Sequence, residues 1–414
     1  MNIDETKAGY KKTIAGTIPA EWNIKQLGEV AQLKNGFSFL SSTYTPLGKY
    51  KVITIANVQD GYMDVEACNK IPSLPQELQQ HHRLHLGDIL ISMTGNVGRV
   101  CRVKENDCLL NQRVGKLIPV GIDEDFLFFL LRQRSFLTAM TGKAKGGAQG
   151  NLSNTDITEH ILAIPTDHHE QQAIATSILD IENLLTSLEQ LIAKKRNIQQ
   201  AAMQQLLTSQ RRLPGFSGSW EVRSIEEIAD CLDNLRVPLN ESQRNSMKGD
   251  YPYCGANGVL DYINSYVIDD DIILMAEDGG YFDEYKFRPI AYRMTGKCWV
   301  NNHAHILKSK SGYDQGFLFY SLVHKNILSY LASGTRAKLN KSEMNKIEIH
   351  LPKEKTEQTA IATILADMDA ELATLETRYE KACQLKQGMM QELLTGRIRL
   401  VSSTSVPTNL SGTQ

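Results

Sequence analysis

Two long stretches of the chain place apolar residues at alternating steps of four and three. The first carries Ile174, Ile178, Ile181, Leu185, Leu188, Ile192, Ala202 and Leu206, with Lys195 and Gln199 at the remaining positions of the frame. The second carries Ile361, Leu365, Met368, Leu372, Leu375, Tyr379, Ala382, Met389 and Leu393, with Lys386 at the remaining position. This heptad seam predicts two helices of about 40 residues, each about 60 Å long.

Prolines and a glycine mark the ends of both helices. Pro165 and Pro352 precede them, and Pro214 and Gly396 follow them. Each seam could pack on its own globular neighbour, or the two helices could pack on each other. Their length and their matched seams favour the second arrangement.

The seams belong to a longer internal repeat, whose copies align without a gap at an offset of 187 residues (Glu170 to Glu357). The aligned pairs include Pro165/Pro352, Glu170-Gln171/Glu357-Gln358, Ala173–Thr176/Ala360–Thr363, Met203-Gln204/Met390-Gln391 and Leu206–Thr208/Leu393–Thr395. A period near half the chain indicates a duplicated domain-plus-helix unit, since solenoid repeats are far shorter.

A less similar region precedes each helix. Residues 87–98 resemble residues 270–280, each an apolar strand that ends in a glycine turn, and the apolar stretch 126–131 resembles 317–322. We therefore expect an α+β fold with two similar domains. The expected segments are a first domain at 1–165, a helix at 166–212, a second domain at 213–352, a helix at 353–400 and a flexible tail at 401–414.

Both domains contain a basic stretch without Asp or Glu, at 126–155 and at 315–342. Each includes a loop in which cations alternate with small and amide residues, a composition suited to phosphate and base-edge contacts. An ordinary solvated loop is the alternative, but recurrence at matched positions favours binding. The candidate contacts are Lys143, Lys145, Gln149 and Asn151 in the first loop and Arg336, Lys338 and Asn340 in the second.

Composition excludes several classes of protein. Apolar residues make up 42% of the chain, but no run approaches a membrane span, and the N-terminal residues do not resemble a signal peptide. The seven cysteines are scattered without a C-x-x-C pair, which predicts reduced cytosolic thiols. A net charge of −2 means that any DNA-binding surface must be local.

The sequence contains none of the common catalytic signatures. It lacks a Walker motif, a G-x-S-x-G elbow, an H-E-x-x-H pair, a deaminase zinc pattern and the amino-methyltransferase tetrapeptide. The pairs His81-His82 and His168-His169 are expected to face solvent, so no metal site is predicted.

The repeated stretches EQQAIATSILDIENLLTSLEQ with MQQLLT, and EQTAIATILADMDAELATLE with MQELLTGRIRL, resemble the specificity subunits of type I restriction–modification systems. The resemblance covers nearly the whole chain and includes LLNQRVGKLIP and YPYCGANGVLDY. It implies two recognition domains, each reading half of a split site in double-stranded DNA. It also implies an antiparallel coiled coil with a pseudo-twofold repeat, which acts as spacer.

The resemblance further implies a cytoplasmic, non-catalytic chain that docks two modification subunits. Those subunits supply S-adenosylmethionine chemistry, and a restriction subunit, where present, uses ATP and Mg. Further candidate DNA contacts are Arg113, Tyr253, Asn257 and Asn302. Candidate partner contacts at the helix ends are Met203, Leu206, Leu207, Met390, Leu393 and Leu394. The alternatives are a stand-alone or phage-defence DNA-binding module of the same fold, and an enzyme in its own right.

Overall fold

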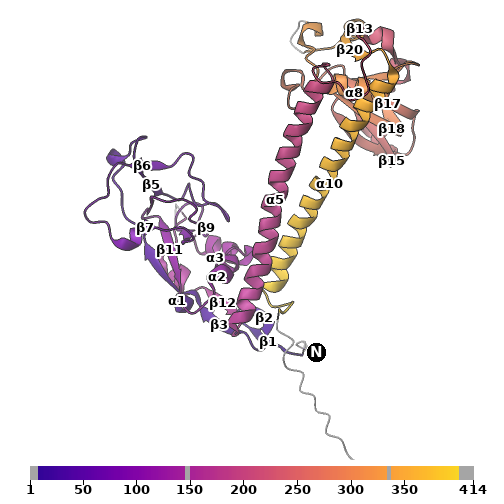
Figure 1. Ribbon diagram of the computed structural model, residues 1–414. Helices are drawn as coiled ribbons and strands as arrows, with labels where there is room; N and C mark the ends of the chain where they lie inside the picture. Colours follow the sequence, from indigo (N-terminus) through magenta and orange to yellow (C-terminus); the bar gives the residue numbers. More distant parts are fainter. Residues whose placement is uncertain (1–7, 145–149, 333–336, 401–414) are drawn as a thin grey trace, which may run out of the picture. The chain divides into compact units, whose positions relative to one another are not determined.

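The structure is a computed structural model that describes residues 8–144, 150–332 and 337–400 (Figure 1). It divides into two compact units, unit 1 at 1–187 with 379–414 and unit 2 at 188–378. Each unit combines a globular part with segments of both long helices. None of the helices in the described ranges has a stretch long and apolar enough to cross a membrane.

Unit 1 contains two two-stranded sheets and two four-stranded sheets. Strand β1 (Tyr10–Thr13) pairs with β2 (Gly16–Pro19), and β3 (Asn23–Gln26) pairs with β12 (Ile161–Ile164). One sheet has the order β4 (Ala31–Asn35), β11 (Val114–Pro119), β8 (Ile89–Ser92) and β9 (Val100–Arg102). The other has the order β6 (Asn69–Ile71), β5 (Tyr50–Ile53), β10 (Cys108–Leu110) and β7 (Arg83–Leu84).

Four helices accompany these sheets, and the chain then enters α5 (His168–Leu206). They are α1 (Leu27–Val30), α2 (Glu124–Leu131), α3 (Arg134–Ala144) and α4 (Asn154–Thr158), with short 3-10 turns at Ser41–Thr43 and Gln80–His82. Six consecutive apolar residues of α2, Phe126–Leu131, are all buried in the core that also contains residues of β8 and α5.

Unit 2 has one six-stranded sheet with the order β14 (Ala229–Cys231), β19 (Ala304–Ser309), β17 (Ile268–Ala276), β18 (Ala291–Val300), β15 (Lys248–Gly255) and β16 (Gly258–Ile263). Strand β13 (Trp220–Ser224) pairs with β20 (Glu348–Pro352). The helices are α6 (Ile225–Ile228), α7 (Glu241–Ser246), α8 (Gln315–Val323), α9 (Lys341–Asn345) and α10 (Lys355–Leu393), with 3-10 turns at Asp233–Leu235, Phe282–Glu284 and Leu328–Tyr330.

The two globular parts share one strand plan, which confirms the α+β prediction. The order β4-β11-β8-β9 corresponds to β14-β19-β17-β18, and the parallel pair β10·β5 corresponds to β18·β15. The ten-residue strand β18 pairs with both β17 and β15 and so joins them into one sheet. Unit 1 interrupts the same course between β9 and β10, where Asp107 has a φ of 57°, and its strands therefore form two sheets.

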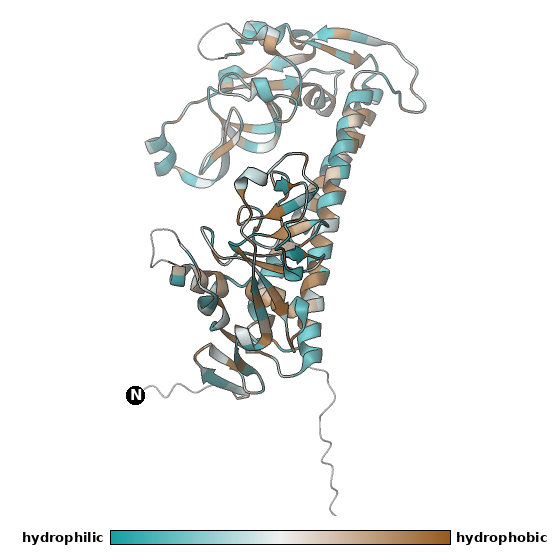
Figure 2. Cartoon of the chain, turned by 90° about the vertical axis from the view of Figure 1, so that its left-hand side faces the viewer, coloured by the Kyte–Doolittle hydropathy of each residue, from teal (hydrophilic) through white to brown (hydrophobic). Residues whose placement is uncertain are grey.

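The long helices follow the predicted seam, and both packings considered for it occur. The first turns pack on the globular cores, where Ile174 and Ile361 are buried. Beyond them, α5 and α10 pair antiparallel within each unit: Lys386 Nζ lies 2.7 Å from Glu182 in unit 1, and Lys195 Nζ lies 2.6 Å from Glu371 in unit 2. Figure 2 shows hydrophobic and hydrophilic residues alternating along the long helix that faces the viewer.

The repeated Glu-Gln pair builds the same clasp in each unit. Glu170 is 1% exposed and accepts two hydrogen bonds from Arg399, at 2.5 and 2.8 Å. Glu357, also 1% exposed, accepts two from Arg212, both at 2.7 Å. In each clasp the first turn of one long helix therefore holds the segment that follows the other.

The neighbouring glutamines fix the domains to the helices. Gln171 accepts from the Asp123 N–H and donates to the Pro165 carbonyl, both at 2.9 Å. Gln358 makes the same two bonds with Asp314 and Pro352, at 2.9 and 2.8 Å. Since Asp123 and Asp314 are the N-caps of α2 and α8, each glutamine ties a long helix to the start of a core helix.

Candidate nucleic-acid and partner interfaces

In unit 1, three segments meet where β8 ends. The Met93 N–H donates to the Arg113 carbonyl at 3.0 Å, and the Met93 carbonyl accepts from the Leu152 N–H at 2.8 Å. Thr94 Oγ1 donates to Asn151 Oδ1 at 2.8 Å. The turn before β11 and the segment before α4 therefore flank the end of β8. We call residues 93–94, 111–113 and 151–152 the first corner.

Unit 2 builds the same corner with the same backbone bonds. The Glu277 N–H donates to the His303 carbonyl at 2.9 Å, and the Glu277 carbonyl accepts from the Leu339 N–H at 2.7 Å. Asp278 forms an isolated bridge with Lys338, as Thr94 does with Asn151. We call residues 277–278, 301–303 and 338–339 the second corner.

A buried asparagine shapes the turn in each corner. Asn111 Oδ1 accepts from the Arg113 N–H at 3.3 Å, and Asn301 Oδ1 accepts from the His303 N–H at 2.8 Å. These asparagines are 8% and 4% exposed. Because each side-chain oxygen accepts from a backbone N–H of the same turn, the asparagine fixes the conformation of the turn. The residues that follow the asparagine are then directed outward.

The corners bring together several predicted contact residues. Arg113 and Asn151 are exposed in the first corner, and Asn302 and Lys338 are exposed in the second. Asn257 is exposed beside the second corner, where its Nδ2 donates to the Gly279 carbonyl at 2.9 Å.

Other predicted contact residues lie elsewhere. Lys143 is exposed at the end of α3 and donates to the Asp156 carbonyl at 2.5 Å. Asn340 is exposed at the N-cap of α9. Lys145, Gln149 and Arg336 lie outside the described residues.

Tyr253 requires a correction. Its side chain is buried in the sheet at 2% exposure, and its hydroxyl accepts from the Leu239 N–H at 2.9 Å. Strand β15 is buried from Tyr253 to Gly255, so Tyr253 supports the chain at Leu239 and is not available to DNA. The expectation that His81 and His82 both face solvent is also wrong, because His82 is 7% exposed and its Nδ1 accepts from the Gln79 N–H at 3.0 Å.

Sequence reasoning missed the acidic members of the second corner. His303 Nδ1 lies 2.7 Å from Asp278 Oδ1, and Lys338 Nζ lies 2.9 Å from Glu277 Oε1. Aligning LNQRVGKLIP with VNNHAHILK places Arg113 opposite His303, so this alignment could have indicated His303. The acids follow β17 and had no such signal. The two corners thus share a backbone but present different side chains.

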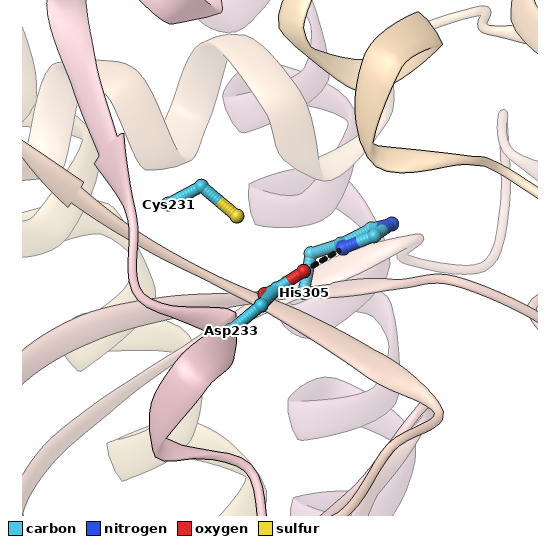
Figure 3. A group of neighbouring side chains, drawn as sticks. All are labelled: Cys231, Asp233 and His305. Atoms are coloured by element: carbon cyan, nitrogen blue, oxygen red, sulfur yellow. Dashed lines mark hydrogen bonds and ion pairs between the residues drawn. The ribbon is translucent and has the colours of Figure 1, made fainter.

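An ion-pair cluster lies beneath the second corner. Figure 3 shows Cys231, Asp233 and His305 gathered together, and one ligand-type atom of each lies within 4.8 Å of the others. Both His305 nitrogens already have partners: Nδ1 lies 2.7 Å from Asp233 Oδ2, and Nε2 lies 2.8 Å from the Leu339 carbonyl. Arg236 Nη2 lies 3.2 Å from the same Asp233 oxygen. A guanidinium in this position is unfavourable for a metal ion, and the arrangement is that of an ion-pair cluster.

The C-terminal part of each long helix lines a groove. The groove in unit 2 has a volume of about 550 Å³, and that in unit 1 about 570 Å³. Four identical residues recur in both at the repeat offset: Gln200/Gln387, Met203/Met390, Gln204/Gln391 and Thr208/Thr395. The end of a core helix forms the other wall, with Tyr320 and Lys325 in unit 2 and Arg132 and Arg134 in unit 1.

The predicted partner residues divide between these grooves and the cores. Three of them are half-buried and line the grooves: Met203, Leu207 and Met390. Leu206, Leu393 and Leu394 are 6%, 5% and 2% exposed and belong to the globular cores. Their assignment to a partner surface is corrected: Leu206 packs the end of α5 on the core of the second domain, and Leu393 and Leu394 pack the end of α10 on the core of the first.

Comparison with known proteins identifies the family. The model of the type I restriction modification DNA specificity domain matches residues 19–199 and 218–383. The chain belongs to this family. It is 33% identical over 162 residues to a putative type I restriction enzyme specificity subunit of Haemophilus influenzae, a match that spans 39% of this chain and 40% of the relative. It is 24% identical to the putative MjaX specificity subunit of Methanocaldococcus jannaschii, over 94% of this chain and 97% of the relative.

Solved structures of the family share the fold. The S subunit of a type I restriction–modification system from M. genitalium superposes with a TM-score of 0.65 and 17% identity, over 90% of this chain and 96% of the other. A chain from a solved type I R-M system gives a TM-score of 0.52 and 15% identity, over 92% of this chain and 99% of the other. The specificity-domain family and the recognition-subunit fold predicted from the sequence are confirmed.

The first corner gives a testable prediction for DNA binding. Arg113 is an exposed cation in the first corner, so Arg113→Ala should weaken binding of the assembled complex to its DNA site by about 1–3 kcal/mol. Fluorescence anisotropy with a labelled duplex measures the loss. Lys104→Ala removes an exposed cation of the same unit outside the corner and should leave the affinity within about 0.5 kcal/mol of the parent. Equal losses for the two variants would argue against the corner as a contact surface.

Proposed function

We propose that the chain is the non-catalytic DNA-reading subunit of a type I restriction–modification complex, with each globular part reading one half of a bipartite site. The observation that carries this proposal is the pair of corners. Both are built by the same backbone hydrogen bonds, so two equivalent frames exist in one chain. Their side chains differ in charge and size, as they must if two frames are to read different bases.

The chemistry of the complex belongs to its other subunits. Methyl transfer requires S-adenosylmethionine, which the modification subunits bind in this proposal, and a restriction subunit uses ATP and Mg. This chain contributes the recognition residues and holds no cofactor. Its role is to place the modification subunits on a chosen DNA sequence.

The paired long helices act as the spacer between the half-sites. Ion pairs between them recur in both units, and the seam residues Leu185, Leu188, Ile192 and Leu372 are buried at 9%, 3%, 8% and 8% exposure. An uninterrupted helix pair is stiff over its length, which suits a structure that fixes a distance along DNA.

Mapping N6-methyladenine in the host genome tests the function and the spacer together. The parent complex should modify a site of two defined halves separated by a fixed number of unspecified base pairs. A variant with one heptad inserted between Leu188 and Glu189, and another between Arg378 and Tyr379, keeps both seams in frame. The insertions lengthen the pair by about 10 Å, so the gap should grow by about three base pairs while both half-sequences remain unchanged.

Two results would count against these proposals. A parent methylation site without two separated halves contradicts the reading function. An active heptad variant that still modifies the original spacing contradicts the spacer role alone. Inserting three residues instead of seven into each helix is the control, because it breaks the seam and should abolish activity.

The paired grooves support docking of two modification subunits. They carry identical residues at the same places of the repeat, as expected if one type of partner binds twice. Met203 and Met390 are half-buried there, and methionine adapts its shape to a partner surface. These grooves favour a subunit of a complex over a stand-alone DNA-binding module.

Single substitutions should separate the two docking sites. Met203→Glu or Met390→Glu places a charge in one groove, and each should reduce the number of bound modification subunits from two to one in native mass spectrometry. The double variant should bind none. Gln205→Glu adds the same charge to an exposed position of α5 outside the groove and should retain both subunits. Two bound subunits in the double variant would exclude the grooves as docking sites.

A further inference from the structure

Five charged side chains meet beneath the second corner, and they come from four separate segments. Asp233 and Arg236 follow β14, Glu277 follows β17, His305 lies in β19, and Lys338 lies before α9. Arg236 is paired with both Asp233 and Glu277, and Glu277 also accepts from Lys338 at 2.9 Å. The side chain of His305 is only 1% exposed, while that of Lys338 is 46% exposed. The cluster therefore runs from the core to the surface of the corner.

The hydrogen bonds of His305 specify its protonation. Nε2 lies 2.8 Å from the Leu339 carbonyl, an acceptor, so this nitrogen must carry a proton. Nδ1 lies 2.7 Å from the Asp233 carboxylate, which also accepts from the Ile306 N–H at 3.0 Å. Since both partners are acceptors, both ring nitrogens donate and His305 is an imidazolium.

The electrostatic balance agrees with this assignment. Burial by itself would lower the pKa of His305, but the bonds to Asp233, Cys231 and the Leu339 carbonyl outweigh it and raise the pKa to about 9. Burial would raise the pKa of Asp233 and Glu277, yet their cationic partners hold both values below the ordinary range. With three cations and two carboxylates, the cluster carries one net positive charge. Lys338 is its outermost member.

Leu339 is the residue that this cluster fixes in place. Its carbonyl accepts from His305, its N–H donates to the Glu277 carbonyl, and its side chain is fully buried. Lys338 and Asn340, which flank Leu339, are both exposed. The orientation of these two candidate DNA contacts thus depends on a bond made by a buried imidazolium.

The first corner holds its equivalent segment without such a cluster. Strand pairing places Gly115 at the position of His305, since Gly115 lies opposite Ile91 as His305 lies opposite Met275. The equivalent backbone bonds place Met93 at the position of Glu277. A β-carbon on Gly115 would come within 2.6 Å of Leu33 and 3.2 Å of Met93, so apolar packing fills this space. The fold therefore does not itself require buried charges here.

We propose that His305 is a positioning residue for DNA recognition by the second domain only: its imidazolium holds Leu339, and through it Lys338 and Asn340, in the orientation that reads one half-site. This inference rests on the proposed function, because it assigns a role within the second of two reading corners. The ligand is the half of a double-stranded DNA site that this domain contacts.

The test measures the two half-sites separately. The probes are duplexes with the methylation site mapped for the parent complex, and duplexes in which one half or the other is scrambled. His305→Phe keeps a flat ring but makes neither hydrogen bond. In the assembled complex it should reduce discrimination at the second domain's half-site by about tenfold or more and leave the first half-site unchanged. Leu351→Ala truncates the core of the same domain in the β13–β20 pair, away from the ion-pair cluster, and is the control for destabilisation of this domain.

Asp233→Asn distinguishes positioning from simple stabilisation. An asparagine can accept from the Ile306 N–H and donate to Nδ1, and Arg236, which loses its acceptor on this side chain, keeps its ion pair with Glu277. A neutral His305 then still donates from Nε2 to Leu339. This variant should keep discrimination near the parent value at pH 7. In the parent, the folded pKa lies above the ordinary value of 6.5, so the stabilisation is present in full below pH 6.5 and is lost as the pH rises through about 9. Discrimination at the second half-site should fall over this range in the parent and stay flat in Asp233→Asn.

Nitrogen-15 NMR of the histidine side chains in the full chain should give the parent His305 the shifts of an imidazolium at pH 7, and those of a neutral ring in Asp233→Asn. The inference is overturned if a folded His305→Phe complex discriminates both half-sites as the parent does, or if Leu351→Ala lowers discrimination at the second half-site as much as His305→Phe does. A parent complex with no sequence preference at all refutes the proposed function instead.

Discussion

The architecture depends on a buried ion pair that occurs twice. Glu170 with Arg399, and Glu357 with Arg212, join the first turn of each long helix to the segment that follows the other one. The carboxylates are 1% exposed, so each needs its two-bonded guanidinium partner. Removing the arginine would leave an uncompensated buried carboxylate, at a cost of about 3–5 kcal/mol. In unit 1, Trp22 also donates to Glu170, at 3.3 Å, and so ties the start of the domain to the same point.

This pair accounts for what the repeat conserves between its two copies and what it leaves free to differ. Each clasp combines residues from both copies of the repeat. Both copies must therefore carry the same three features: Glu-Gln at the start of the helix, the apolar seam along it and the arginine after it. The corners take no part in these contacts. Their backbone bonds are retained, but Arg113 corresponds to His303 and Met93 to Glu277. One scaffold can thus hold two corners whose side chains differ, while the paired grooves remain alike.

The sequence allowed the helices, the repeat and the α+β domains to be predicted, because heptad spacing and gapless matches are local signals. It did not show that Tyr253, Leu206, Leu393 and Leu394 are buried, since periodicity indicates a face but not what covers it. The corners were only partly predictable. Each is formed by three segments far apart in the chain, and Asn151 and Lys338 were found by composition while Glu277 and His305 were not. The pairing of Glu170 with Arg399 was also not evident, because both copies of the repeat contain the same glutamate and arginine. Sequence alone does not show whether the glutamate pairs with the arginine of its own copy or of the other.

Exchange of one reading domain tests the account most directly. Residues from β3 to β12, Asn23–Ile164, can be replaced by the corresponding segment of a relative that reads another site, with Trp22, Glu170 and Arg399 left in place to preserve the clasp. The methylated adenines of the exchanged complex are then mapped in a genome. The account predicts that one half of the site changes to that of the relative, while the other half and the spacing stay the same. A change in both halves, or an unchanged site in an active complex, would contradict it.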